Sequence, residues 1–490
     1  MNFPERLWPA ANHVQHEPVH FSLRFTERPV VLALGDLLVL NLALLASLTL
    51  RSEIRAADLS PATLAAWCLV ISVFWFAPAL WLNVYDLPRA ARPLASLWWT
   101  GIAALVTTVV FILTPWITPG LPVTRLELVT LPFLAAAGMS IWRIAYARIL
   151  AQPAFCQQAL VIGAGWAGCH LAETIAGLGG VSNNYAPGTG YRIAGFIDDD
   201  PQKAHRSIHG IPVLGTRKDL DRLVQQLQPD EIVVAIIHQD QIDDDLFRTI
   251  LACRSLGIPV TTMPSVYERL TGRVEVLSSG NDLNVVLPLE PPVHLRVYLL
   301  LRRALDVAVA LGGCVVVAAL VPGIWLVNRC TSPGDIFYFQ ERVGKGGRPF
   351  AIVKFRSMVM HAERYSGAVW ASEHDPRITP LGRILRRTRI DELPQFWNVL
   401  RGDMTLIGPR PERPCFVQPL KEQCPVYCAR HAVPPGLTGW AQVMYRYGAS
   451  VEDSLMKLKY DLYYIKHQGP YLDALIVLKT VRVILGLMGR

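Results

Sequence analysis

Two adjacent carboxylates, Asp391 and Glu392, lie within an arginine-rich segment that extends from Arg386 to Arg413. An arginine guanidinium binds phosphate oxygens through paired hydrogen bonds, and nearby cations favour the ionised form of a carboxylate. An ionised carboxylate can hold Mg²⁺ or attack phosphorus. These residue types at this spacing therefore indicate a site that handles phosphate groups.

A charged amphipathic helix with scattered surface ion pairs is the alternative for this segment. Two features of the sequence argue against it. Pro394 follows the two acids and interrupts any helix that contains them, and Gly408-Pro409-Arg410-Pro411 is a rigid turn that presents one arginine. The phosphate site is therefore the better interpretation.

The segment is one of several short motifs that follow one another along the C-terminal part of the chain. They are Gln340-Glu341-Arg342-Val343-Gly344, Lys354-Phe355-Arg356-Ser357-Met358, Asp391-Glu392-Leu393-Pro394-Gln395, Gly408-Pro409-Arg410-Pro411-Glu412 and Pro435-Gly436-Leu437-Thr438-Gly439-Trp440. In this order they resemble the bacterial sugar transferase family, in its long-form polyprenyl-phosphate hexose-1-phosphate transferases (undecaprenyl-phosphate glucose or galactose phosphotransferase type). Five ordered motifs are far more specific than one short match.

The resemblance implies a reaction and two catalytic residues. The enzyme would transfer hexose-1-phosphate from a UDP-hexose to undecaprenyl phosphate or another polyprenyl phosphate and release UMP, the initiating step of exopolysaccharide, capsule or O-antigen biosynthesis. Asp391 would attack the β-phosphorus to form a phosphosugar-aspartyl intermediate, and Glu392 would help hold Mg²⁺ as the metal cofactor. Glucose and galactose are the leading hexoses.

The cationic candidates for binding the substrate phosphates and the nucleotide are Lys354, Arg356, Arg386, Arg410 and Arg446. Arg386 and Arg410 rank first because they flank the acids in the two closest motif matches. Each cation could instead belong to a surface ion pair. That alternative is strongest for Arg446, whose neighbours Tyr445 and Tyr447 differ from the Gly-Arg context of the family.

The composition predicts a membrane protein, because 52% of the residues are hydrophobic, only 18% are charged and the mean hydropathy is +0.30. The length of 490 residues allows about three domains. Four apolar stretches approach the roughly 20 residues that a spanning helix needs. Together they predict a transmembrane domain over 29–150, with helices at Pro29–Leu50, Ala62–Tyr85, Leu94–Trp116 and Leu126–Leu150.

Positive charges predict the orientation of these helices, because loops rich in Lys and Arg stay in the cytoplasm. The loop 117–124 has no charge, whereas four arginines follow the second stretch or close the fourth: Arg89, Arg92, Arg143 and Arg148. We therefore expect a multi-pass protein of the bacterial inner membrane, with the N-terminal segment 1–28 and all residues after 150 on the cytoplasmic side. Arg51 and Arg55 in the first loop argue against this orientation.

Residues 154–275 alternate between strands and helices and predict a Rossmann-like doubly wound accessory domain. A glycine turn with Gly163, Gly165 and Gly168 follows a buried strand and precedes a helix, as in dinucleotide-binding sites, with Asp198 as the candidate acid for a ribose. Asp198 comes 30 residues after Gly168, later than the roughly 20 residues of that motif. Two interpretations stay open: nucleotide binding, or a scaffold or regulatory domain without redox chemistry, which the resemblance favours.

Another long apolar run, Val307–Val327, follows a linker at 276–297 and lies within the segment 298–330. A helix that crossed the membrane there would place the residues after it on the side away from cytoplasmic nucleotide sugars. Pro322 breaks the run, and a helix bent at that proline can enter and leave by the same face. The resemblance implies such a re-entrant helix, followed by a catalytic domain at 331–490.

The predicted fold class is an α/β membrane protein with four transmembrane helices, a Rossmann-like doubly wound domain and a monotopic catalytic domain with a re-entrant membrane helix. The apolar spacing of 471–488 indicates a helix that either rests on the bilayer or packs on the domain core. The formal charge of +8 suits anionic lipid headgroups and nucleotides, and no motif indicates nucleic-acid binding. A homodimer is left open.

Two other classes of protein fit the sequence less well. A membrane-bound nucleotide-sugar dehydratase needs a Tyr-x-x-x-Lys pair in a large nucleotide-binding domain, and Tyr460 is not followed by lysine at the fourth place. A non-catalytic membrane scaffold is expected to have lost Asp391, Glu392 or Lys354, and all three are present. The transferase is therefore the favoured function.

Overall fold

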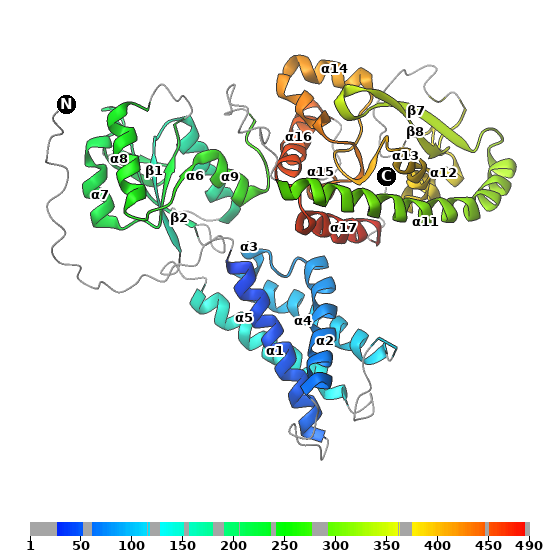
Figure 1. Cartoon of the computed structure of the whole chain (residues 1–490), viewed down its shortest axis with the longest axis horizontal. Coiled ribbons are helices and arrows are strands. Elements are labelled where there is room, and N and C mark those ends of the chain that lie inside the picture. The colour runs from blue at the N-terminus through cyan, green and yellow to red at the C-terminus, as the bar shows by residue number, and fades with distance from the viewer. Residues whose placement is uncertain are drawn as a thin grey trace.

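The computed structural model shows three parts, a membrane bundle, a sheet domain and a C-terminal domain (Figure 1). It describes residues 27–51, 61–114, 116–117, 128–150, 156–179, 191–204, 206–236, 242–276, 293–360, 362, 375–445 and 450–485. Most of the predicted N-terminal segment 1–28 and of the predicted linker 276–297 lies outside these residues, as does Arg446.

The membrane bundle consists of apolar helices that pack side by side. They are α1 (Arg28–Arg51), α2 (Pro61–Trp81), α4 (Pro93–Leu113) and α5 (Thr130–Ala145), with a short α3 (Leu87–Ala90) before α4. Of these, α1, α2 and α4 are long and apolar enough to cross a membrane. The fourth predicted span is shorter than expected, because α5 has only 16 residues before a π-helical turn, Tyr146–Leu150.

A buried ion pair joins the first and last helices of the bundle. An Arg143 amino group lies 2.5 Å from Asp36 Oδ2, and both side chains are fully buried. Trp75 Nε1 donates to the hydroxyl of Tyr85 over 2.6 Å, and the Tyr85 ring lies beside the Arg143 guanidinium. Charges inside an apolar bundle persist where they are paired, so this pair fixes how α1 and α5 face each other.

The sheet domain contains a six-stranded sheet in the order β3-β4-β2-β1-β5-β6, in which only β3 is antiparallel to its neighbour. The strands are β1 (Gln157–Ile162), β2 (Tyr191–Ile197), β3 (Ser207–Ile208), β4 (Ile211–Gly215), β5 (Glu231–Val234) and β6 (Val260–Thr262). The alternation of strands and helices predicted for this region is therefore present. The β3–β4 hairpin at one edge is an addition that the sequence did not predict.

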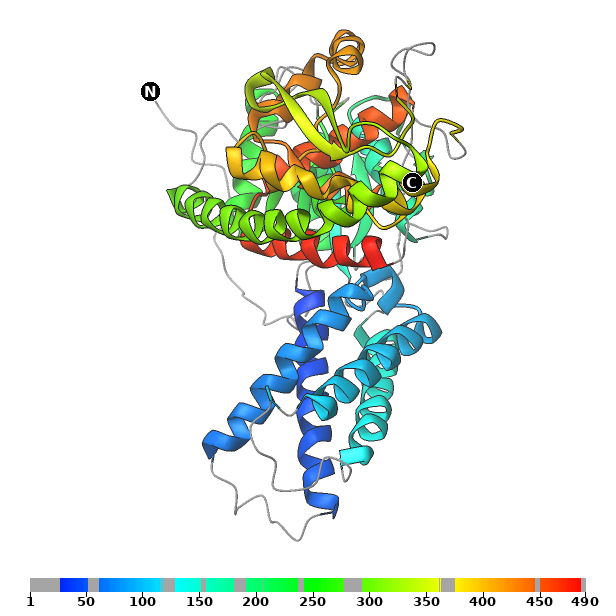
Figure 2. The same ribbon diagram turned by 90° about the vertical axis from the view of Figure 1, so that its right-hand side faces the viewer.

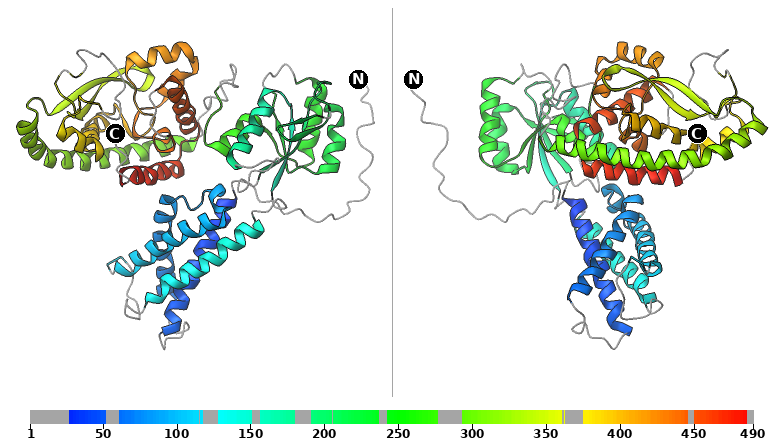
Figure 3. Two further views of the ribbon diagram at one scale, coloured as in Figure 1. Left: turned by 180° about the vertical axis from the view of Figure 1, so that it is seen from behind. Right: turned by 45° about the vertical axis from the view of Figure 1, so that its right-hand side comes forward.

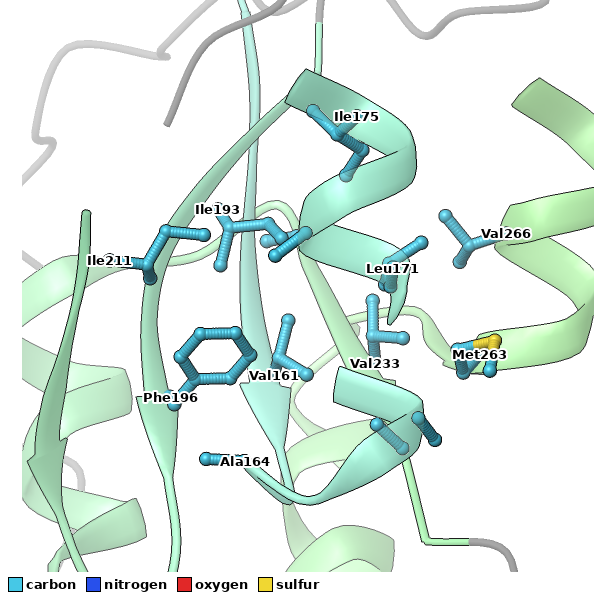
Figure 4. Packing of buried hydrophobic residues seen from close by; sticks show 14 of the residues in the cluster. Val161, Ala164, Leu171, Ile175, Ile193, Phe196, Ile211, Val233, Met263 and Val266 are labelled. Atoms are coloured by element: carbon cyan, nitrogen blue, oxygen red, sulfur yellow. The ribbon is translucent and has the colours of Figure 1, made fainter. Parts of the chain in front are cut away.

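Helices cover both faces of this sheet and bury the apolar side chains of its central strands. Helices α6 (Trp166–Gly179) and α9 (Met263–Thr271) pack on one face, where Val161, Phe196 and Val233 lie in the core (Figure 4). Helices α7 (Leu220–Leu227) and α8 (Asp244–Ser255) pack on the other face. A parallel sheet buried on both faces requires such continuous apolar strands.

The C-terminal domain combines helices with two small sheets. Its elements are α11 (Val293–Thr331), β7 (Phe337–Val343), β8 (Pro349–Phe355), α12 (Pro380–Arg387), a 3₁₀ turn (Ile390–Gln395), α13 (Phe396–Arg401), β9 (Thr405–Ile407), α14 (Pro414–Gln423), a 3₁₀ segment (Pro425–Ala432), β10 (Gly436–Thr438), α15 (Trp440–Met444), α16 (Val451–Lys466) and α17 (Pro470–Leu485). Strands β7 and β8 pair antiparallel, and β9 and β10 pair parallel.

Helix α11 continues through Pro322, so the prediction that the helix breaks at this proline is wrong. A proline removes one backbone hydrogen bond. The helical turns on both sides of Pro322 are apolar, and the helix ends only at Thr331. Gly313, in the middle of the helix, packs so closely on Phe396 that a Cβ there would lie 2.3 Å from the ring. The helix therefore runs along the C-terminal domain instead of leaving it.

Both ends of α11 are bound to the C-terminal domain. Near its start, Thr405 Oγ1 accepts a hydrogen bond from Arg302 over 3.0 Å and donates one to Asp306 over 2.6 Å. Near its end, Asn328 accepts a hydrogen bond from Arg356 over 2.9 Å. Only 6% of its most apolar window is buried, so the outward face of this helix is a large apolar surface.

Helices α11 and α17 both lie across the end of the membrane bundle (Figure 2). The sheet domain and the C-terminal domain stand beside each other on the same side of the bundle (Figure 3). Lys479 of α17 donates to Asn83 Oδ1, in the turn after α2, over 2.9 Å. The apolar faces of α11 and α17 thus lie level with one end of the bundle.

The segment after α9 joins the sheet domain to the C-terminal domain. Val274 is fully buried among apolar residues of the C-terminal domain, and its backbone N–H donates to the Lys459 carbonyl over 3.0 Å. The Lys459 ammonium lies 2.9 Å from the buried carboxylate of Glu275, and Lys466 lies 2.9 Å from Glu268. Apolar packing and ion pairs therefore hold the two domains together.

The ion pair in the bundle gives a prediction for stability. We expect Asp36→Asn to lower the free energy of unfolding by about 3 kcal/mol, because it leaves the Arg143 charge buried without its partner. Thermal unfolding of the detergent-purified protein measures this effect. The double variant Asp36→Asn/Arg143→Gln removes both charges and is expected to melt above the single variant. Equal melting of wild type and Asp36→Asn would contradict the prediction.

Candidate active site

The two acids lie on the 3₁₀ turn between α12 and α13. Arg389, directly before this turn, adopts a left-handed backbone conformation with φ of 60°, which is uncommon for a residue with a side chain. As the sequence predicted, Pro394 is incompatible with a regular α-helix here, and the turn is 3₁₀. The sharp reversal brings Asp391 and Glu392 to the wall of a large cavity.

This cavity has a volume of about 2660 Å³ and two chemically different ends. The predicted site residues at its polar end are Lys354, Arg356, Arg386, Asp391, Glu392 and Arg410. The other end is lined by apolar side chains of the two helices that lie across the bundle, among them Leu301, Leu305, Val309, Val477, Val481 and Ile484. Asn83 of the bundle also lines it. A molecule with a charged head and an apolar tail fits both ends.

Glu392 is paired with two cations from distant segments. Its Oε1 lies 3.1 Å from Lys354 Nζ on β8 and 2.6 Å from an Arg410 amino group in the proline-rich turn. Burial favours the protonated form of Glu392, but the charges of Arg410 and Lys354 outweigh burial and hold its pKa well below the usual range. Glu392 is therefore ionised across the physiological pH range.

Asp391 differs from its neighbour. Its side chain is buried, and no described residue forms a hydrogen bond with its Oδ1. Burial, together with the adjacent charge of Glu392, raises its pKa to about 6 despite the nearby cations. The nearby cations lower the pKa of Asp391, as the sequence predicted, but burial has the larger effect, so this carboxyl is ionised only above about pH 6. A buried oxygen without a partner is uncommon in a folded protein, and a ligand that donates or coordinates to it would satisfy it.

Two predicted cations contact neighbouring groups of the protein. Arg386 Nε donates to Ser357 Oγ over 2.8 Å. One amino group of Arg356 donates to Asn328, so Arg356 binds the end of α11. The Nε and the other amino group of Arg356 have no hydrogen-bond partner among the described residues. Arg356 therefore anchors α11 and also remains a candidate for binding phosphate.

Several residues of the cavity wall were missed by the sequence analysis. Arg389, two residues before Asp391, lines the cavity. Gln395 Nε2, four residues after Asp391, is buried beside the two acids without a hydrogen-bond partner among the described residues. Their nearness in the sequence could have indicated both. Arg430 and Asp461 also line the cavity and form a buried ion pair of 2.7 Å. Arg430 and Asp461 are 31 residues apart, so no short sequence motif could have indicated this pair.

The glycine turn of the sheet domain has a structural explanation. Gly163 has φ of 102°, and a Cβ at Gly168 would lie 2.2 Å from the Gly163 carbonyl oxygen. A Cβ at Gly165 would meet no atom within 4 Å. Asp198 accepts a hydrogen bond from Ala164 N over 2.8 Å and pairs with Lys203. The fold thus requires Gly163 and Gly168 to be glycine, and a nucleotide at this turn stays a prediction.

Few carboxylates are available for a metal ion. Within the described part of the chain, no group of three or more His, Cys, Asp or Glu residues could hold one. Asp391 Oδ1 is nevertheless free of protein partners among these residues, next to the ionised Glu392. Mg²⁺ is commonly held by one or two carboxylates together with substrate phosphates, so this pair fits Mg²⁺ once a diphosphate is present.

Comparison with known proteins places this site in a family. Residues 297–486 match the family model described as bacterial sugar transferase, and residues 81–264 match one described as CoA-binding domain. The UDP-glucose:undecaprenyl-phosphate glucose-1-phosphate transferase of Escherichia coli (strain K12) is 30% identical over 364 residues, which cover 70% of this chain and 75% of that protein. The chain belongs to the bacterial sugar transferase family. The family prediction from the ordered motifs, and with it the prediction of a transferase, is confirmed.

Other bacterial sugar transferases are similar over different lengths. The UDP-N-acetylgalactosamine-undecaprenyl-phosphate N-acetylgalactosaminephosphotransferase of Aeromonas hydrophila is 41% identical over 256 residues, 52% of this chain and 59% of that protein. The undecaprenyl-phosphate glucose phosphotransferase of Komagataeibacter xylinus is 28% identical over 477 residues, 94% of this chain and 85% of that protein. The long form of the family is thus supported.

The unequal environments of the two acids predict opposite effects on stability. Asp391 binds its proton more tightly in the folded protein than in the unfolded chain. The free energy of unfolding therefore falls as pH rises from about 4 to 6 and Asp391 ionises. We expect Asp391→Asn to raise the free energy of unfolding at pH 8 by up to about 3 kcal/mol, at about 1.4 kcal/mol per pKa unit. The gain should fade as pH falls from 6 towards 4. Thermal unfolding at several pH values measures it.

Glu392→Gln is the matched comparison. It leaves Lys354 and Arg410 without their common partner and is expected to lower the melting temperature at pH 8. The same sign of change in both variants would show that the two acids do not have the unequal environments described.

Proposed function

We propose that this bacterial sugar transferase transfers a sugar-1-phosphate from a UDP-sugar to a polyprenyl phosphate and releases UMP. The single observation that carries the proposal is the cavity that joins Asp391, with its free buried oxygen, to an apolar end formed by α11 and α17. The names of the relatives support it, because they describe transfer to undecaprenyl phosphate.

In this proposal Asp391 is the nucleophile. Its Oδ1 attacks the β-phosphorus of the UDP-sugar, the bond from that phosphorus to the bridging oxygen breaks, and UMP leaves with the electron pair. The sugar-phosphate is then bound to Asp391 as an acyl phosphate. An oxygen of the polyprenyl phosphate attacks the same phosphorus and frees the carboxylate. Lys354, Arg386 and Arg410 lower the repulsion between these anions.

Mg²⁺ belongs to the proposal as a cofactor. Glu392 would help hold the ion against the diphosphate of the donor. When bound, Mg²⁺ supplies positive charge that makes UMP a better leaving group. The pairing of Glu392 with Lys354 and Arg410 leaves its Oε2 as the atom for this role, since its Oε1 accepts from both cations.

The proposal includes a monotopic placement of the C-terminal domain, with α11 as a re-entrant helix and the active site in the cytoplasm. The binding of both ends of α11 to one domain supports this placement. A helix that crossed the bilayer would leave one of these ends on the opposite side from the domain. The sheet domain is proposed as a Rossmann-like accessory domain, and the closure of its glycine turn by Asp198 supports a structural role.

The donor sugar stays open between several hexoses. Glucose and galactose are implied by the motifs. The relatives in Escherichia coli and Komagataeibacter xylinus are named for glucose, whereas the Aeromonas hydrophila relative is named for N-acetylgalactosamine. A panel of donors therefore has to include UDP-glucose, UDP-galactose and UDP-N-acetylgalactosamine.

The reaction is tested by UMP release from nanodisc-embedded protein supplied with undecaprenyl phosphate, Mg²⁺ and this panel of donors. We expect release with one donor and a loss of at least about 10³-fold in Asp391→Asn, because the amide cannot act as the nucleophile. Asp403→Asn, the same chemical change outside the cavity, serves as the control and should retain activity. No UMP from any donor with the wild type would overturn the proposal.

The metal is tested by its removal. Chelation of divalent ions with EDTA should abolish UMP release, and Mg²⁺ added in excess should restore it, because the donor diphosphate would otherwise keep its full charge. Glu392→Gln should require a higher Mg²⁺ concentration for half-maximal rate than Asp403→Asn. Full activity in the presence of EDTA would contradict the metal requirement and show that the lysine and arginine side chains alone neutralise the donor diphosphate.

A further inference from the structure

Arg430 forms a bridge between three protein groups in the wall of the active-site cavity. One of its amino groups lies 2.7 Å from Asp461 Oδ2 on α16 and also donates to the backbone carbonyl of Arg410 over 2.9 Å. Its other amino group donates to the hydroxyl of Tyr427 over 2.5 Å. Asp461 and Arg430 are both buried. Arg430 therefore uses its donors on protein groups, one of which is the main chain of a predicted phosphate-binding residue.

The main chain around Arg410 is held on each side by other contacts. Gly408 N donates to the Thr438 carbonyl over 2.8 Å, and Gly436 N donates to the Pro409 carbonyl over 2.9 Å. These bonds fix the residues before Arg410. After Arg410, the Pro411 carbonyl accepts from Arg342 over 3.1 Å and the Glu412 carbonyl accepts from Val343 N over 2.9 Å. The carbonyl of Arg410 itself accepts from Arg430, so this contact adds a restraint on the peptide group of Arg410.

The Arg410 side chain points at the acids. Its amino group lies 2.6 Å from Glu392 Oε1. A continuous series of hydrogen bonds thus runs from Asp461 through Arg430 and the Arg410 main chain to Glu392. Helix α16 carries Asp461 and is held by a further ion pair. Lys459, two residues before Asp461 on this helix, pairs with Glu275 in the segment that joins the two domains.

We propose that Arg430, held by Asp461, is a positioning residue that sets Arg410 in place to bind the diphosphate of the donor. The inference rests on the proposed function, in which Arg410 contacts that diphosphate. Asp461 and Arg430 would not touch the reacting atoms, and their effect would pass through Arg410 alone. A buried ion pair that serves only stability is the alternative, and it predicts no dependence on Arg410.

The experiment is a double-mutant cycle on binding of UDP, which carries the diphosphate but no sugar to transfer. The dissociation constant of UDP is measured by calorimetric titration of the nanodisc-embedded full chain, at fixed Mg²⁺, for wild type, Asp461→Asn, Arg410→Ala and the double variant. We expect Asp461→Asn to weaken binding about tenfold in the wild-type background, the typical size of one charged hydrogen bond. In the Arg410→Ala background it should change binding less than about twofold.

Two further variants serve as a control and as a replacement for Asp461→Asn. Glu268→Gln loosens the last turn of α16 without touching Arg430, and UDP binding should stay within about twofold of wild type. If Asp461→Asn gives no cooperative thermal unfolding, Arg430→Lys replaces it in the cycle, because lysine keeps the charge beside Asp461 but cannot maintain the same bridge to the Arg410 carbonyl. The same dependence on Arg410 is expected.

The outcomes separate this inference from the proposed function. An equal effect of Asp461→Asn with and without Arg410, or no effect in either background, overturns the positioning role. A wild type that binds UDP but releases UMP from no donor overturns the proposed function while the cycle still decides the role of Arg430. A wild type that does not bind UDP overturns both.

Discussion

The pairing of Glu392 with Lys354 and Arg410 is the constraint on which the site depends. The three residues come from a 3₁₀ turn, a strand and a proline-rich turn that are distant in the sequence, and buried charges require close partners. Both cations point at Glu392, and Asp391 keeps an unpartnered oxygen. Burial, together with the charge of Glu392, raises the pKa of Asp391. Two neighbouring carboxylates in unequal environments are suited to different chemical roles.

A second constraint comes from α11. An apolar helix of 39 residues would carry the chain away from the site if only one end were attached. Hydrogen bonds at Thr405 and Asn328 hold both ends, and the close contact between Gly313 and Phe396 holds the middle. The charged and apolar ends of the cavity consequently stay continuous. In the proposed function, this continuity lets a water-soluble donor and a lipid acceptor meet at one phosphorus atom.

The ordered motifs, through the family resemblance, predicted which residues gather at the polar end of the cavity, although these residues come from segments that are distant in the sequence. They did not predict the raised pKa of Asp391, since burial by distant segments is absent from local sequence. Pro322 was expected to break or bend a helix, but α11 continues through it, because a proline removes only one backbone hydrogen bond of a long helix. The pairing of Arg430 with Asp461 joins segments that share no pattern, so only the fold shows it.

The sheet domain was predicted well, because alternating buried strands and amphipathic helices have distinct periodicities. Its border with the C-terminal domain was harder to place. The matches to the two family models end at 264 and begin at 297, yet Val274 lies in the core of the C-terminal domain and Glu275 pairs with Lys459. The sheet domain is therefore not an exchangeable module. Any chimaera joined in this interval has to keep residues 272–276 with the C-terminal domain, or that domain loses part of its own interior.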